Sequence, residues 1–413
     1  MAKPTNSKIP KIRFKGFAGN WDDSPIGQIL TEKKRPIKLK DNQQYELITV
    51  KRRNEGVVSR GRLFGRQILV KNYSQLEAGD FVISKRQVVH GATGIISPEL
   101  DNAIVSNEYL VAVGNGSLSM EFLTILASLP DMRRKFFLSS YGVDIEKLFF
   151  DADDWRARSI TIPKLPEQTQ IVGYFREINR LIGLQQRKHD KLVTLKNAML
   201  EKMFPKPGTT TPEIRFKGFS GDWVETTLGD LMPITSAARV HKHQWTRSGV
   251  PFFRTSDVIS RFKGEANERA FISVELYAQL SKKVGRIKRG DILITGGGSI
   301  GIPFLADSDE PLYFKDADLL WLKVPEVVNS TYLYVFFTSV PFRAYLKSIS
   351  HIGTIGHYTV EQAKSTPITV PGRAEQQKIG DYFRTLDELI SKHALQLEKL
   401  KQIKAACLER MFA

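Results

Sequence analysis

The chain contains an internal repeat, and this repeat limits the possible folds more than any other feature of the sequence. The dodecamer PKIRFKGFAGNW at residues 10–21 returns as PEIRFKGFSGDW at 212–223, with nine of twelve positions identical. A longer pair, residues 161–204 and 369–412, aligns without a gap and shares 18 of 44 residues. We therefore expect one folding unit present twice, each copy ending in the same kind of segment.

Between these shared ends the two copies diverge. EAGDFVIS (77–84) corresponds to KRGDILIT (288–295), and NEYLVAV (107–113) corresponds to DADLLWLKV (316–324). Short β-branched or apolar runs bounded by Gly, Pro, Asp or Asn predict strands, with helical pieces at 119–129 and 329–349. Each copy is thus predicted to hold a mixed α/β module on a common scaffold, and the divergence predicts two different binding specificities.

The 44-residue segments predict two long helices, starting near Pro166 and Ala374. The apolar residues of the second segment recur at steps of three, four or seven, at Leu386, Ile390, Leu397, Leu400, Cys407 and Met411. About 38 residues of helix would span ~57 Å, and the narrow apolar stripe favours packing of helix on helix. His189 and His393 lie in or beside this stripe, and without paired ligand spacing they are interpreted as polar interface residues, not metal ligands.

Charge points to a polyanionic partner. The chain of 413 residues carries a formal net charge of +17, which favours nucleic acid. No run of residues has the roughly 18–20 apolar side chains of a membrane span, and the first residues lack the apolar core of a signal peptide. The single cysteine, Cys407, excludes an internal disulfide framework and a cysteine-based zinc cluster. Together these features predict a cytoplasmic protein.

We find no catalytic motif. The chain has no Pro-Pro dipeptide, as a methyltransferase loop would need, and no carboxylate cluster typical of a nuclease. TGGGSIG (295–301) lacks the Lys-Ser/Thr of a phosphate-binding loop, so a backbone turn is favoured over a cofactor site or a phosphate contact. Asp151, Asp153 and Asp154 are interpreted as a solvated loop or helix cap, in preference to a metal site.

Basic residues cluster at comparable places in the two copies. Residues 51–71 have a net charge of +6 and residues 239–263 a net charge of +5. Arg and Lys neutralise phosphates, and Arg and Thr also contact base edges. Candidate DNA contacts here are Lys51, Arg52, Arg53, Arg60, Arg62, Arg66, Arg239, His241, Lys242, Arg247, Arg254 and Thr255.

Smaller polar sets accompany glycine-rich stretches at 84–94, 295–301 and 351–362. They add the candidates Lys85, Arg86, His90, Thr93, Ser299, His357 and Tyr358. Taken singly, each of these residues is more typical of an ordinary loop than of a DNA contact. For both basic clusters the alternative to DNA binding is a solvated charged surface.

Each half of the chain contains the same series of motifs: IRFKGFxGxW, then GD[FI][VL]I[ST] and a glycine-rich middle, then P…EQ…I…YF before a long helix. This repeated series resembles the DNA-specificity subunit of Type I restriction-modification systems. The resemblance covers essentially the whole chain, and its most specific part is the pair 161–204 and 369–412. It implies an α+β fold: two tandem target-recognition domains at 1–160 and 213–368. These would be separated by two antiparallel coiled-coil spacer helices at 161–204 and 369–413, with a linker at 205–212 and pseudo-twofold symmetry.

The same resemblance implies a non-catalytic subunit. Each domain would bind one half of a bipartite, asymmetric site in double-stranded DNA, and the helices would set the gap. Two methyltransferase subunits would bind S-adenosylmethionine, and ATP-driven restriction subunits with Mg²⁺ could join them, so this chain itself would bind no cofactor or metal. Three rivals stay open: a self-contained methyltransferase or nuclease, a coiled-coil scaffold that does not contact DNA, and an RNA-binding protein.

Overall fold

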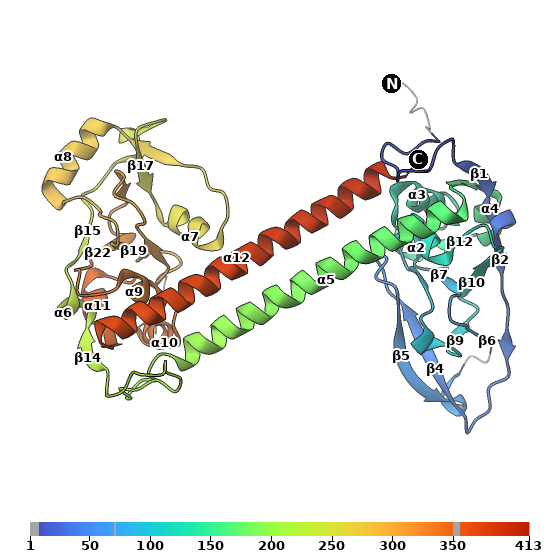
Figure 1. Cartoon of the computed structure of the whole chain (residues 1–413), viewed down its shortest axis with the longest axis horizontal. Coiled ribbons are helices and arrows are strands. Elements are labelled where there is room, and N and C mark those ends of the chain that lie inside the picture. The colour runs from blue at the N-terminus through green and yellow to red at the C-terminus, as the bar shows by residue number, and fades with distance from the viewer. Residues whose placement is uncertain (1–7, 70–71, 350–355, 413) are drawn as a thin grey trace. The chain divides into compact units, whose positions relative to one another are not determined.

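The computed structural model describes residues 8–69, 72–349 and 356–412, and the chain divides into two compact units. Unit 1 comprises residues 1–184 with 397–413, and unit 2 comprises residues 185–396. Helix α5 (Leu165–Lys202) and helix α12 (Arg373–Arg410) each cross this division, so both units contain part of both helices (Figure 1).

Both units begin and end their α/β module with the same strand pair. In unit 1, β1 (Asp22–Pro25) pairs antiparallel with β13 (Ser159–Ile162). In unit 2, β14 (Val224–Thr227) pairs antiparallel with β23 (Pro367–Val370). The two registers correspond under the sequence repeat, since Asp22 faces Ile162 as Val224 faces Val370. The first two residues of each 44-residue segment therefore lie in a strand, and the helix starts after it.

A four-stranded sheet of common topology forms the centre of each unit. Its order in the described part of unit 1 is β2 (Leu30–Glu32), β10 (Tyr109–Gly114), β7 (Phe81–Ser84), β8 (Thr93–Ile95). Its order in the described part of unit 2 is β15 (Ile234–Ser236), β22 (Leu319–Leu322), β19 (Ile292–Thr295), β20 (Pro303–Leu305). The two short sequence matches in the middle are thus the adjacent inner strands, β7 and β10 in one unit and β19 and β22 in the other.

Short helices pack around this sheet in the same order in both units. Unit 1 has α1 (Ile26–Ile29), α2 (Met120–Ser128), α3 (Pro130–Leu138) and α4 (Ala152–Ala157). Unit 2 has α6 (Leu228–Leu231), α9 (Ser330–Phe336), α10 (Val340–Ile349) and α11 (Val360–Lys364). Polar N-caps start several of them: the Ser119 hydroxyl accepts from the amide of Phe122, and the Asn329 side chain accepts from the amide of Tyr332.

The acidic trio of the sequence is a helix cap, one of the two roles expected. Asp151 accepts hydrogen bonds from the amides of Asp153 and Asp154, 3.0 Å each, at the start of α4. Asp153 and Asp154 in turn pair with Arg156 and Arg158. These carboxylates satisfy helix amides and arginines.

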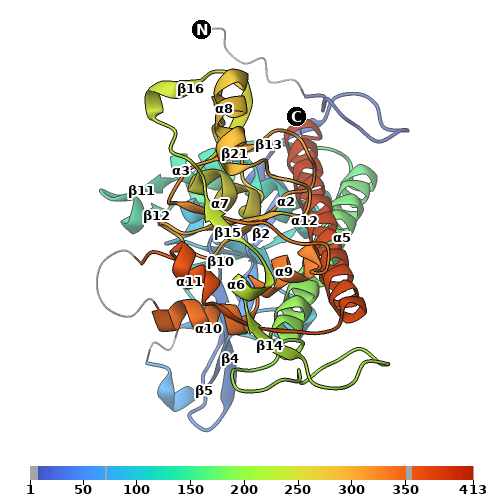
Figure 2. The ribbon, with the colours of Figure 1, turned by 90° about the vertical axis from the view of Figure 1, so that its left-hand side faces the viewer.

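A second sheet differs between the units. The described part of unit 1 has the order β3 (Pro36–Ile37), β6 (Tyr73–Gln75), β9 (Ile104–Ser106), β4 (Gln44–Val50), β5 (Val57–Phe64). The described part of unit 2 has β16 (Trp245–Thr246), β18 (Ala270–Ile272), β17 (Val250–Phe253), β21 (Tyr313–Phe314), with helices α7 (Thr255–Lys263) and α8 (Val274–Val284). A hairpin of β11 (Ser140–Tyr141) and β12 (Phe149–Phe150) extends from unit 1 (Figure 2).

Each core includes the end of a long helix. In unit 1 the ring of Phe412, just beyond α12, lies 6.0 Å from that of Trp21 and 5.8 Å from that of Phe122. In unit 2 the ring of Phe204, beyond α5 and 2% exposed, lies 6.3 Å from that of Trp223 and 5.7 Å from that of Tyr332. The Met-Phe that ends both 44-residue segments is therefore an apolar anchor.

Both long helices contain 38 residues, the length expected from the periodicity. Within unit 2 they run antiparallel: Gln185 donates to Gln396 over 2.7 Å, and Lys196 of α5 pairs with Asp387 of α12. The Nδ1 atom of His393 lies 2.8 Å from the side-chain oxygen of Gln185, which agrees with a polar contact between helices. The α+β fold class with two long antiparallel helices is confirmed.

Candidate nucleic-acid interface

The repeated dodecamer fastens each module to the start of its long helix. The guanidinium of Arg13 contacts both carboxylate oxygens of Glu167 at 2.7 Å and donates to the Gly19 carbonyl over 2.5 Å. Arg215 does the same in unit 2, with Glu375 at 2.7 Å and the Gly221 carbonyl at 2.6 Å. Hydrogen bonding to the glutamate raises the pKa of each guanidinium. The dodecamer therefore packs each module against the first turn of its long helix.

The glutamine after each of these glutamates is also buried. Gln168, 0% exposed, donates to the carbonyls of Ser117 and Pro163 and accepts from the amide of Ser119. In unit 2, Gln376 donates to the Pro371 carbonyl and accepts from the amide of Asn329. The Glu-Gln pair of each repeat thus joins the dodecamer, the last strand and the cap of a core helix. This fixes the module on its helix without contributing to an exposed binding surface.

Two of the predicted contact sets form one surface in unit 1. The amide of Arg53 donates to the His90 carbonyl over 2.7 Å, and that of Asn54 donates to the Gly91 carbonyl over 2.8 Å. Gly91 has a φ of +76°, and a Cβ there would lie 2.5 Å from the Asn54 side-chain oxygen. The Arg52 guanidinium donates to Gln87 over 2.7 Å. The loop at 51–56 and the turn at 85–91 therefore belong to a single region, in which residues 51–53 and Arg86 are exposed.

The arginines of the β4–β5 hairpin have different surroundings. Arg62 pairs with Glu46 at 2.6 Å, and the Arg66 guanidinium lies 5.2 Å from the centre of the Phe64 ring. Arg60 is exposed and has no carboxylate partner within 4 Å among the described residues, so it has the most freedom to meet a phosphate. Lys51 is exposed as well. Lys71, part of the same cluster in the sequence, lies outside the described residues.

Lys85 and Arg86 are held by neighbouring groups, and Thr93 is buried. Lys85 donates to the Asn107 carbonyl over 2.9 Å. Arg86 pairs with Glu108 at 2.9 Å and lies 5.1 Å from the centre of the Phe149 ring. Thr93, 1% exposed on strand β8, has no surface available to DNA, so we remove it from the candidate contacts.

In unit 2 the first part of the basic cluster is exposed. Arg239, His241, Lys242 and Arg247 are all at the surface. The His241 ring is stacked on that of His243, with centroids 5.5 Å apart. This segment precedes and includes β16, an outer strand of the sheet that is particular to unit 2. Its exposed cations fit the predicted role.

Arg254 instead supports the local fold. Its guanidinium contacts Asp257 at 2.8 Å, donates to the Glu268 carbonyl, and lies 5.7 Å from the Trp245 ring. The hydrogen bond to Asp257 raises the pKa of this arginine. The neighbouring Thr255 hydroxyl is buried and has no hydrogen-bond partner in the described chain. A role in folding explains Arg254 better than the predicted DNA contact does.

The glycine-rich stretch of unit 2 is a tight turn after β19. The hydroxyl of Thr295 donates to the Ser299 carbonyl over 2.6 Å and accepts from the amide of Ile302 over 2.8 Å. A Cβ on Gly296 would lie 2.6 Å from the Tyr358 carbonyl, so this glycine permits close packing. The favoured interpretation as a backbone turn is confirmed, and the Ser299 side chain lies exposed at its tip.

His357 and Tyr358 face different surroundings. His357 is exposed, whereas Tyr358 is 1% exposed and its hydroxyl lies 2.5 Å from that of Thr366. Burial raises the pKa of the Tyr358 hydroxyl well above its ordinary value. Tyr358 is therefore a core residue, which corrects the predicted DNA contact. Residues 350–355 of the same stretch lie outside the described residues.

Two further groups of exposed basic residues lie outside the predicted contact sets. Arg133 of α3 is exposed and reaches the Asn54 side chain at 3.5 Å, which adds it to the surface of unit 1. The end of α8 and the loop after it carry five exposed cations between residues 282 and 289, namely Lys282, Lys283, Arg286, Lys288 and Arg289. The run KKVGRIKR contains no acidic residue and was visible in the sequence as a charge signal.

Among the described residues no group of three or more His, Cys, Asp or Glu side chains is arranged to hold a metal ion, and no helix is long and apolar enough to cross a membrane.

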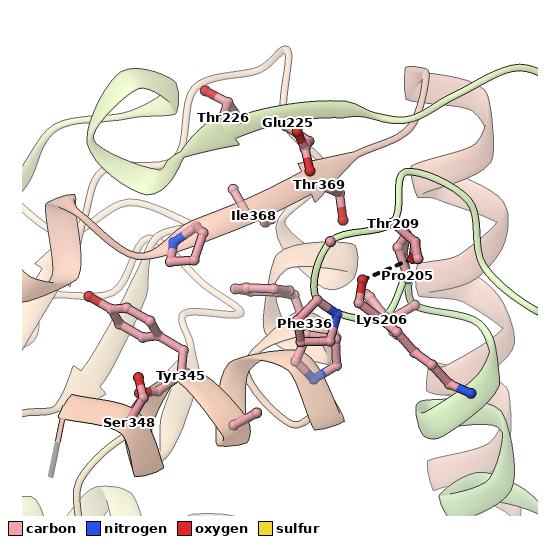
Figure 3. A pocket seen from close by; sticks show the side chains of 16 residues that line it. Pro205, Lys206, Thr209, Glu225, Thr226, Phe336, Tyr345, Ser348, Ile368 and Thr369 are labelled. Atoms are coloured by element: carbon pink, nitrogen blue, oxygen red, sulfur yellow. Dashed lines mark hydrogen bonds between the residues drawn. The ribbon is translucent and has the colours of Figure 1, made fainter. Parts of the chain in front are cut away.

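A cavity of about 550 Å³ in unit 2 lies between the 205–209 linker, the β14–β23 pair and α10 (Figure 3). Phe336, Tyr345 and Ile368 line it together with four prolines, Pro205, Pro207, Pro341 and Pro367.

Comparison with known proteins accords with this geometry. Residues 220–402 match the family model of the Type I restriction modification DNA specificity domain. A putative type I restriction enzyme specificity subunit from Haemophilus influenzae is 32% identical over 169 residues, which are 40% of this chain and 41% of that protein. The resemblance to Type I specificity subunits is confirmed.

Solved structures extend the likeness in fold to nearly the whole chain. The Type I restriction-modification S subunit from M. genitalium aligns over 98% of this chain and 99% of its own, with a TM-score of 0.53 and 13% identity. A second chain comes from a structure on complex assembly and conformational transition of the type I restriction-modification system. It aligns over 95% of this chain and 97% of its own, with a TM-score of 0.50 and 18% identity. At such identities the likeness concerns the fold. The curated relative is matched over about two fifths of its length.

Proposed function

We propose that this chain is the DNA-recognition subunit of a Type I restriction-modification complex, and that each unit binds one half of a bipartite, asymmetric DNA site. One observation carries the proposal: the two units share a strand pair, a central sheet and their helices, but differ in the second sheet. A common scaffold with different insertions is what two domains need if they recognise different sequences from the same kind of support. The exposed basic residues in both insertions favour DNA as the partner.

In this proposal the long helices set the unspecified gap between the half-sites, and two methyltransferase subunits dock on the helices and flanking loops. Methyl transfer would use S-adenosylmethionine on those subunits, and restriction subunits would bring ATP and Mg²⁺. The chain itself would supply recognition, with Arg60 and Arg53 in unit 1 and Lys242 and Arg247 in unit 2 as leading candidates for contacts. Arginine and lysine neutralise phosphates, and arginine also binds guanine edges.

Sequencing of modified bases in the host genome, with and without this chain, tests the proposal. A single bipartite motif should lose its methylation when the chain is absent and regain it on complementation. If the modified motifs are the same with and without the chain, the proposal fails.

Purified components separate the rival functions. The chain alone, incubated with DNA and S-adenosylmethionine, should transfer no methyl groups, whereas a self-contained methyltransferase would. A salt-sensitive gel shift on duplex DNA should be seen with the assembled complex, whereas a scaffold without DNA contact would give none.

A further inference from the structure

The β11–β12 hairpin of unit 1 presents apolar side chains to solvent. Val143 is fully exposed, and Tyr141 and Ile145 are 61% and 54% exposed. We refer to Tyr141, Val143 and Ile145 as the apolar tip. Single exposed apolar residues are ordinary, but three within five residues on a projecting hairpin are a concentrated apolar surface.

The hairpin is held firmly at its base. Phe150 is 1% exposed, and its amide donates to the Lys85 carbonyl over 3.0 Å. The Tyr141 ring lies 5.8 Å from that of Phe149. Asp144 accepts from the amide of Glu146 over 3.1 Å and so closes the turn. The apolar tip thus has a defined direction before any partner binds.

The candidate DNA-binding surface adjoins this hairpin directly. Glu146 contacts Arg52 at 3.0 Å and His90 at 3.3 Å, and Arg86 lies over the Phe149 ring. The adjoining segments 51–55, 85–86, 107–108, 131–135 and 144–147 contain nine Lys or Arg and five Asp or Glu, a net charge of nine minus five, or +4.

Two kinds of partner could cover an apolar tip, a protein or DNA. Tyrosine and arginine are both common in protein–protein interfaces, so residue type alone does not decide, but the net charge of +4 around the tip favours a polyanionic partner. Proteins that deform DNA often place apolar side chains between base pairs while basic neighbours hold the phosphates. The composition around the tip matches the second arrangement.

We propose that the apolar tip inserts into a groove of the half-site bound by unit 1 and partly unstacks one base step. This inference rests on the proposed DNA recognition by unit 1 and adds a mode of binding to it. Since pyrimidine–purine steps unstack most easily, such a step should be preferred where the tip inserts, even without hydrogen bonds to its bases.

The test uses the complete complex with its methyltransferase and a duplex that contains the motif found by sequencing. The duplex carries 2-aminopurine in the half-site of unit 1, away from the methylated base, because this base fluoresces more strongly when unstacked. The double variant Val143→Ser/Ile145→Ser should bind about 10-fold more weakly and lose the fluorescence increase. The dependence of affinity on salt should not change, because no phosphate contact is removed.

Two controls complete the design. Val274→Ser/Val327→Ser changes two valines of unit 2 that are 60% and 73% exposed, and should leave affinity and fluorescence as in the wild type. The conservative Val143→Ile should retain the fluorescence increase, since it keeps an apolar side chain at the tip.

The outcomes are distinct. Equal affinity and equal fluorescence for the double variant would refute the insertion while leaving DNA recognition by the complex intact. Loss of methyltransferase from the purified complex, with DNA affinity otherwise retained, would identify the tip as a protein contact and also refute it. A wild-type complex that fails to bind the motif at all would overturn the proposed function together with this inference.

Discussion

At the scale of single residues, the buried ion pair between dodecamer and helix explains why the repeated motif contains arginine. Arg215 uses three nitrogens at once, two on Glu375 and one on the Gly221 carbonyl. The Glu375 side chain is only 2% exposed, so it requires a charged partner with several donors. A lysine would keep the charge but would lose the two-pronged geometry.

Replacement of Arg215 by Ala should lower the free energy of unfolding of unit 2 by about 3–5 kcal/mol, because it leaves a carboxylate buried and unpaired. Arg215→Lys should cost less. Thermal unfolding of unit 2, monitored by hydrogen exchange, would measure the change in free energy of unfolding for both variants. Arg13→Ala is the matched control, and should loosen unit 1 while unit 2 keeps its protection. An equal loss of protection in both units after either change would contradict a local role.

Arg60→Ala should weaken recognition of one DNA half-site, and Arg247→Ala should weaken recognition of the other. Each substitution should also reduce the slope of log affinity against log salt by about one, since one phosphate contact is lost. Affinity measurements with the complete complex at several salt concentrations would test this. Arg254→Ala serves as a comparison, because its expected effect is a loss of local stability. Unchanged slopes for both Arg60 and Arg247 would exclude them as phosphate contacts.

Charge and residue type in the sequence found the exposed basic segments but not the environment of each side chain. Thr93 and Tyr358 accompany glycines in polar stretches, yet both are 1% exposed because they belong to the sheet and core of their units. Arg254 lies in a basic cluster, yet its partner Asp257 is three residues away, in the first turn of α7. Burial depends on contacts that local composition does not encode, and the pairing of Arg254 depends on where α7 begins.

At the scale of elements, the long helices were predictable because their signal is strong and continuous. A regular apolar stripe, without proline or glycine between residues 381 and 412, predicts a helix from near Ala374 to the end of this stretch, close to the observed 38 residues. The second sheets were not predictable in detail, since strands such as β3 and β16 contain two residues each. The register of such strands depends on partners far along the chain.

The antiparallel pairing of α5 with α12 in unit 2 indicates how to test whether these helices set the gap between the half-sites. Insertion of about four residues, one helical turn, should be made in both helices, after Lys188 and after His393, so that contacts such as Lys196 with Asp387 keep their partners. The expected result is a changed gap with unchanged half-sites, determined by sequencing modified bases. Changed half-sites with the original gap would refute the role of the helices as a spacer.

At the scale of the whole molecule, unit 1 is not a continuous stretch of sequence, whereas unit 2 consists of residues 185–396. The core of unit 1 requires residues near Met411, and the core of unit 2 requires Leu200 and Met203. The hydrogen bond from the Ile12 amide to the Arg410 carbonyl, 2.9 Å, has its counterpart between the Ile214 amide and the Lys202 carbonyl, also 2.9 Å. Each module is thus joined in the same way to the end of a helix that starts at the other module in the sequence.

Phe204→Ala should destabilise unit 2 by about 3–5 kcal/mol, because it removes a buried ring that packs against Trp223 and Tyr332. Phe412→Ala should act on unit 1, through Trp21 and Phe122, and to a smaller extent because Phe412 is only partly buried. Hydrogen exchange resolved by unit would locate each effect. If Phe412→Ala reduced protection only in unit 2, the assignment of this helix end to the core of unit 1 would be wrong.

The position of Phe412 also has a consequence for biosynthesis. Residues 1–184 leave the ribosome first, but the aromatic cluster of Trp21 and Phe122 is not covered until residues 407–412 have been added. At 5–20 residues per second, about 200 further residues take on the order of 10–40 seconds. Unit 1 therefore cannot complete its core before residues 407–412 have been made, although most of its residues are made first, and an apolar face of its first module stays uncovered in the meantime.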